Sequence, residues 1–151
     1  MKPSERLTEL KINLPTPTAP IGSYVPANRS GRHIFTSGQL PMRDGTLVYA
    51  GKVPNDVTLE EAADASRIAA IAGLAAAAQV AGGVDNIKRV VRVCVFVNSS
   101  PGFTAQPKVA NGASDFLAQV FGDAGRHARS AVGVAELPIN AAVEVELIVE
   151  L

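Results

Sequence analysis

The alternation of apolar and polar residues is clearest at the end of the chain, over residues 143–148. Apolar and mainly acidic positions alternate there, as Val143, Val145 and Leu147 against Glu144, Glu146 and Ile148. This period of two predicts a strand with one buried face. A strand is also predicted to begin at Arg129, with residues 137–140 (Leu-Pro-Ile-Asn) as the turn between the two. A C-terminal hairpin is therefore expected.

Other segments carry weaker strand patterns and clear helix signals. Further strands are predicted over residues 33–37, 46–53 and 87–97, the first two joined as a hairpin by the Arg43-Asp44-Gly45 turn. The capping box Thr58-Leu-Glu-Glu61 predicts a long helix that ends near Ala81, before Gly82-Gly83. Its many alanines allow it to lie close to a sheet. A second helix is predicted over residues 107–120, with Val109, Phe116, Leu117 and Val120 as core positions.

The order of these elements is β-β-α-β-α-β-β, which predicts one α+β domain over residues 1–151. Residues 1–17 form its lead-in, in which residues 4–12 are helical or irregular. We expect a mixed sheet covered on one face by two helices. The other face would then be uncovered, and such a face is usually hidden by oligomerisation, which creates clefts between subunits.

The composition of the chain bears on two questions: whether it binds nucleic acid or membranes, and in which cellular compartment it lies. Lysine plus arginine and aspartate plus glutamate each number 14, so no basic surface for nucleic acid is expected. The longest uncharged run, residues 68–84, is too weakly apolar for a membrane span, and no apolar signal core follows the N-terminus. The single cysteine, Cys94, lies in a strand pattern and is predicted to be buried. A cytoplasmic protein is therefore expected.

Candidate chemistry is concentrated in the C-terminal strands. Arg129 begins the first of them, and its planar guanidinium suits a two-point grip on a carboxylate. Glu144 places a carboxylate in the second of these strands. An ordinary surface pair of these two residues is the structural alternative, and exposed pairs of this kind are common. The spacing of the two residues alone favours that alternative.

Classical catalytic and metal-binding sets are missing from the sequence. His33 and His127 lie far apart and have no ligand spacing, so no metal site is predicted. Ser37 and Ser130 have no base that the sequence places beside them. No glycine-rich phosphate-binding motif is present either.

Several motifs together resemble the reactive intermediate deaminase family, also called RidA or YjgF and once labelled endoribonuclease L-PSP. The motifs are Pro20-Ile-Gly-Ser-Tyr24, Phe35-Thr-Ser-Gly-Gln-Leu-Pro41, Val93-Cys-Val-Phe-Val97, Asn111, Ala128-Arg-Ser-Ala-Val-Gly-Val-Ala-Glu-Leu-Pro138 and Val143-Glu-Val-Glu146. The resemblance implies a chorismate-mutase-like fold and a homotrimer with sites between subunits. It also implies hydrolysis of enamines and imines, such as 2-aminoacrylate and 2-iminopropanoate, to 2-oxo acids and ammonia without a cofactor.

The resemblance assigns roles to individual residues. Arg129 matches the arginine that holds the substrate carboxylate, and Glu144 matches the glutamate associated with the catalytic water. The remaining matches line the cleft, namely Tyr24, Ser37, Gly38 and Asn111. The chain departs from the family pattern at Ser114, His127 and Ala131, where many members have tyrosine, proline and cysteine.

Two other functions compete with imine hydrolysis. A non-catalytic trimer that binds small oxo or imino acids would need Arg129 but not Glu144, and the changed positions leave this possibility open. A ribonuclease is suggested by the old family label. The balanced charge, the two unpaired histidines and the few aromatic residues argue against it.

Overall fold

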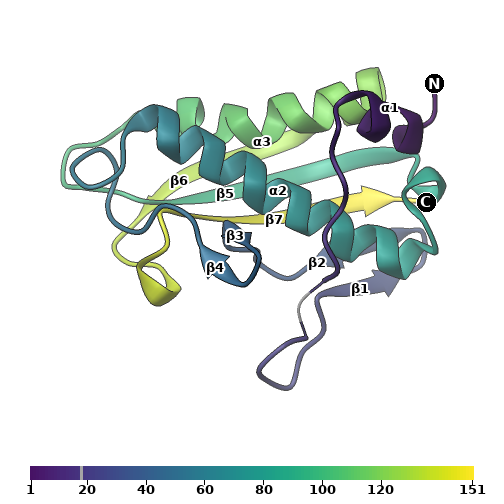
Figure 1. Cartoon of the computed structure of the whole chain (residues 1–151), viewed down its shortest axis with the longest axis horizontal. Coiled ribbons are helices and arrows are strands. Elements are labelled where there is room, and N and C mark those ends of the chain that lie inside the picture. Colours follow the sequence, from purple (N-terminus) through teal and green to yellow (C-terminus); the bar gives the residue numbers. More distant parts are fainter. Residues whose placement is uncertain (18) are drawn as a thin grey trace.

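The computed structural model describes residues 1–17 and 19–151, and its main feature is a five-stranded sheet with two long helices on one face (Figure 1). The helices are α1 (Pro3–Glu9), α2 (Leu59–Ala81) and α3 (Gln106–Phe121). The strands are β1 (Ala27–Ser30), β2 (His33–Thr36), β3 (Met42–Arg43), β4 (Thr46–Leu47), β5 (Arg89–Asn98), β6 (Ala128–Val134) and β7 (Val143–Glu150). This is the predicted two-layer α+β architecture.

The sheet order is β1-β2-β7-β5-β6, with β5 and β6 parallel and the other neighbours antiparallel. The expected C-terminal hairpin is therefore wrong, because β5 lies between β6 and β7. Strand β6 has no fully buried residue, whereas β7 buries every second side chain. That difference in burial suits β6 to the edge and β7 to the middle of the sheet.

The N-terminal hairpin also differs from the prediction. Strand β2 pairs with β1, which lies upstream, and not with residues 46–53. Only Thr46 and Leu47 of that range form a strand, in a separate two-stranded sheet with β3. Strand β1 has three exposed residues out of four, so it carries no apolar alternation that would have predicted it.

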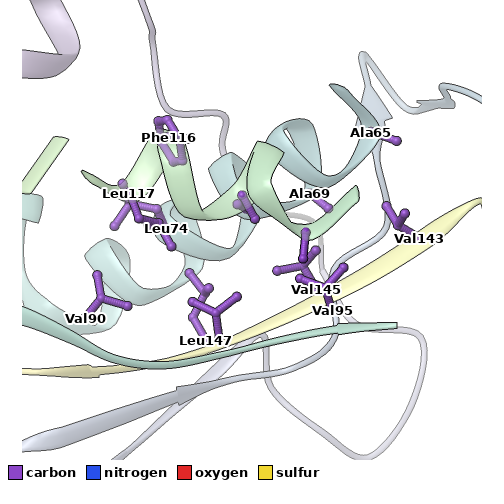
Figure 2. Close-up of a cluster of buried hydrophobic side chains, with 14 of the residues drawn as sticks. Ala65, Ala69, Leu74, Val90, Val95, Phe116, Leu117, Val143, Val145 and Leu147 are labelled. Carbon is purple, nitrogen blue, oxygen red and sulfur yellow. The ribbon is translucent and has the colours of Figure 1, made fainter. Parts of the chain in front are cut away.

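Helix α2 begins and ends where its sequence signals predicted. The Thr58 side chain accepts a hydrogen bond from the Glu61 amide at 3.1 Å, and the Glu61 carboxylate accepts one from the Thr58 amide at 3.0 Å. Gly82 ends the helix with a φ of 77°. A core of small and branched side chains fills the space between the helices and the sheet (Figure 2).

The close approach of α2 to its neighbours makes its buried alanines sensitive to size. Ala69 is fully buried, whereas Ala72, one turn further on, is only half-buried. We expect Ala69→Leu to lower the free energy of unfolding by roughly 1–3 kcal/mol, because the added carbons have no space. Ala72→Leu is the matched control and should change it less. Equal denaturation midpoints for both variants in urea would show that the register of this helix is wrong.

Within residues 1–17 and 19–151, the second face of the sheet carries no helix. Side chains on this face include Cys94, Phe96, Val132 and Ile148, together with Glu144 and Glu146. Val132 is 44% exposed, and Phe35 of β2 is 45% exposed on the same face. Cys94 is partly exposed rather than buried, because Val93 and Val95 take the helix-facing positions of β5.

The N-terminal lead-in packs onto the rest of the domain as a short helix. Helix α1 occupies residues 3–9 and is tied to the rest of the chain by Ser4, whose amide and hydroxyl donate to Asp85 at 2.9 and 2.7 Å. None of the helices in the described residues has the length and apolar character needed to span a membrane.

Candidate functional site

Arg129 is held against helix α3 at the edge of the sheet. It pairs with Val93 in register, so its side chain lies on the helix-covered face. Its Nη1 donates to Asn111 Oδ1 at 2.9 Å and to Ser114 Oγ at 3.1 Å. One chain therefore brings Arg129 and Asn111 together.

The two bonds from Nη1 fix the plane of the guanidinium. Within residues 1–17 and 19–151, Nε and Nη2 of Arg129 make no hydrogen bond or ion pair. The Nε–Nη2 edge therefore keeps two parallel donors. This is the geometry that grips both oxygens of a carboxylate.

Behind Arg129 lies His127, in a hydrogen-bonded chain that sequence reasoning did not assign to the site. His127 Nδ1 lies 2.6 Å from the Gly125 carbonyl, which can only accept, so Nδ1 carries the proton. Nε2 lies 2.9 Å from Ser114 Oγ and accepts its hydroxyl proton. Burial lowers the pKa of His127, and the charge of Arg129 lowers it further, while the bond to Gly125 opposes both. His127 is therefore neutral at physiological pH.

These side chains border a cleft of about 310 Å³ between α3 and the start of β6. The lining residues are Ser114, Asp115, Ala118, Gly125, Arg126, His127 and Arg129. The only sequence signal for Ser114 and His127 was their departure from the family pattern. No motif predicted that the two would touch each other.

A second group of predicted site residues lies where β2 ends, beside β7. The Gln39 and Val145 amides each donate to the other residue's carbonyl, at 2.8 and 2.9 Å, and fix the chain there. Gly38 consequently lies against Glu144, and a Cβ at Gly38 would come within 2.7 Å of the Glu144 Cδ. A larger residue at position 38 would therefore displace this carboxylate. Burial raises the pKa of Glu144, and repulsion by Glu146 raises it further.

Ser37 is hydrogen-bonded to the segment that carries Tyr24 and so holds this segment beside the second group. The Ser37 amide donates to the Pro26 carbonyl at 2.8 Å, and its hydroxyl donates to the Val25 carbonyl at 2.6 Å. These bonds hold the segment that carries Tyr24, which is 53% exposed. Ser37 therefore positions that segment within the chain.

The two groups lie on opposite faces of the sheet. Arg129 is in register with Val93, which faces the helices, whereas Glu144 is in register with Phe96, which faces away from them. No ion pair joins Arg129 and Glu144 in the described part of the chain, so the ordinary surface pair is wrong for these two residues. Within a single copy of the chain, the two groups of candidate residues therefore do not meet.

Comparison with known proteins identifies the family to which this fold belongs. The sequence profile of the family described as "YjgF/chorismate mutase-like, putative endoribonuclease" matches residues 4–151, so the chain belongs to this family. The resemblance noted in the sequence is thereby confirmed.

Across the described residues, no group of three side chains suited to a metal ion comes together.

Individual relatives support the assignment to the family. The chain is 47% identical to Protein TCP17 of Trypanosoma cruzi, over 96% of this chain and 91% of that protein. It is 31% identical to a 2-iminobutanoate/2-iminopropanoate deaminase of Dermatophagoides farinae, over 91% and 93% of the two chains. A crystal structure of a protein of unknown function from Agrobacterium tumefaciens superimposes with a TM-score of 0.91, at 43% identity and over 99% and 92% of the chains.

Proposed function

We propose that the protein hydrolyses small imino acids, such as 2-iminopropanoate, to 2-oxo acids and ammonia. The observation that carries this proposal is the guanidinium of Arg129, anchored through Nη1 with its Nε–Nη2 edge open beside a cleft. An imino acid presents a carboxylate next to its C=N bond, so a grip on the carboxylate fixes the reacting carbon. The relationship to an iminobutanoate/iminopropanoate deaminase supports the same substrate class.

The complete site would form between copies of the chain. Because the half-sites of Arg129 and Glu144 lie on opposite faces, a ring in which the edge of one copy meets the uncovered face of the next would join them. That face has exposed apolar side chains to bury, and Ile21, in the segment before Tyr24, is 98% exposed. A homotrimer is the assembly that we propose.

Glu144 would supply the proton transfers in such a cleft. Its carboxylate takes a proton from water as the water oxygen attacks the imine carbon, and the electrons of the C=N bond move to nitrogen. Glu144 then returns that proton to nitrogen, which gives a carbinolamine with an NH2 group. It next takes the proton of the hydroxyl group and passes it to the same nitrogen, so the C–N bond breaks, ammonia leaves and the hydroxyl oxygen becomes the carbonyl oxygen. A raised pKa suits this role, because a carboxyl group that holds its proton more firmly is the stronger base.

Ammonia release from imines generated by an amino-acid oxidase tests the activity. We expect turnover by the wild type and its loss in Arg129→Ala, with light scattering giving the mass of a trimer. If the wild type hydrolyses no imine yet binds 2-oxobutanoate through Arg129, the protein is a binding module. A monomeric mass at micromolar concentration would contradict the shared cleft.

Mixed assemblies test the shared cleft directly. Arg129→Ala and Glu144→Gln should each be inactive alone, because every cleft lacks one half-site. Co-expression of the two variants should restore activity in about a quarter of the clefts, those in which the Glu144→Gln copy supplies Arg129 and the Arg129→Ala copy supplies Glu144. The control is a mixture of the two variants purified separately, under conditions in which they do not exchange subunits, and it should stay inactive. If each variant is inactive alone and co-expression restores nothing, the two residues do not act together across an interface between copies.

A further inference from the structure

The hydrogen-bonded chain behind Arg129 has a fixed direction. Arg129 Nη1 donates to Ser114, Ser114 donates to His127 Nε2, and His127 Nδ1 donates to the Gly125 carbonyl. Ser114 therefore connects the guanidinium to an imidazole nitrogen that is free to take a proton. The cleft beside them is bordered by all three side chains.

We propose that Ser114 and His127 form a proton-accepting relay behind Arg129, which takes up a proton when a small carboxylate binds the guanidinium and then presents the Ser114 hydroxyl to that ligand. The identity of the ligand class rests on the proposed function. The relay itself rests on the contacts among these residues.

Reversal of one hydrogen bond is the physical basis of the relay. Once Nε2 is protonated it must donate, and Ser114 Oγ, at 2.9 Å, becomes its acceptor. The Ser114 hydroxyl can then no longer donate its proton to His127, so its O–H bond must point elsewhere. Arg129 Nη1 already donates to the same oxygen, so the hydroxyl turns away from both groups and towards the cleft. A bound carboxylate would be an acceptor there.

Charge couples this reversal to ligand binding. Arg129 disfavours a second cation at His127, and a carboxylate on the guanidinium offsets that repulsion. The other charged groups at the cleft are Arg126, in the loop that carries His127, and Asp115, on α3. Arg126 is paired with Asp123 at 3.7 Å, and Arg92 of β5 turns to Ser130 on the far face. Burial is the largest cause of the lowered pKa of His127, and Arg129 is the cation whose charge adds to it.

Calorimetry with 2-oxobutanoate, in buffers of different ionisation enthalpy, measures the proton uptake. We expect the wild type to take up protons on binding, and the affinity to rise about five- to tenfold from about pH 8 to pH 6, as is typical of coupling between two sites. NMR offers a second readout, because the chain has only two histidines and His33 serves as the reference. The His127 signals should titrate at higher pH in the complex.

Variants separate the relay from other ionisations. His127→Asn should bind the ligand without proton uptake, and Ser114→Ala should reduce the uptake. His33→Asn should behave as the wild type does. Glu144→Gln should still take up the proton on binding, because that proton goes to His127. Loss of the uptake in this variant would show that the proton goes to Glu144 instead.

The possible outcomes also distinguish this inference from the proposed function. Binding through Arg129 with no proton uptake and no change at His127 would overturn the relay and leave imine hydrolysis standing. Proton uptake in a protein that hydrolyses no imine would support the relay and overturn the function. A wild type that does not bind 2-oxobutanoate would overturn the relay, whereas ammonia release from imines would still decide the function.

Discussion

Arg129→Lys should lose most of the activity although it keeps the positive charge. An ammonium has no planar fork, so it cannot hold Asn111, Ser114 and a carboxylate in the fixed directions that Arg129 provides. Loss of one charge-assisted contact is worth about 1.5–3 kcal/mol, or roughly ten- to a hundredfold in kcat/KM. Steady-state ammonia release measures this loss.

Arg126→Lys is the matched control for this substitution. Arg126 borders the same cleft, but its side chain is 84% exposed, and among the described residues it is paired only with Asp123. We expect a small change there, because exposed pairs contribute little. Similar losses in both variants would mean that the cleft needs positive charge and not the geometry of Arg129.

The sequence predicted the elements whose signals are local and missed the pairing of strands far apart in the chain. The limits of α2 follow from Thr58, Glu61 and Gly82, which act within a few residues of the helix ends. The placement of β7 between β2 and β5 depends on which surfaces bury best together, and a turn sequence does not encode that. The crossover after β6 was therefore mistaken for a hairpin.

The candidate site divides in the same way. Family motifs pointed to Arg129, Asn111, Gly38 and Glu144, and the structure adds contacts within each pair. Nothing local in the sequence joins Ser114 to His127, because one lies on a helix and the other precedes a strand. Their contact arises only when α3 packs beside β6.

Glu144→Gln should remove turnover while leaving ligand binding through Arg129 intact. The amide keeps the shape beside Gly38 but cannot accept the proton from water, and general acid–base help is typically worth about 10²- to 10⁴-fold. Wild-type kcat/KM should fall as the pH is lowered through the raised pKa of Glu144, at a higher pH than for an ordinary carboxyl group. Turnover of Glu144→Gln at the wild-type rate would exclude Glu144 as the base.

The same variant should be more stable than the wild type at neutral pH, which separates a functional loss from a folding defect. Because the folded-state pKa of Glu144 is raised, its contribution to stability is fully present below the unfolded pKa and is lost as the pH rises through the folded value. Removing the half-buried charge beside Glu146 relieves that cost. The difference in melting temperature between Glu144→Gln and the wild type should therefore grow as the pH rises from acid to neutral. A variant that is less stable throughout this range would show that Glu144 supports the fold and is not a strained catalytic group.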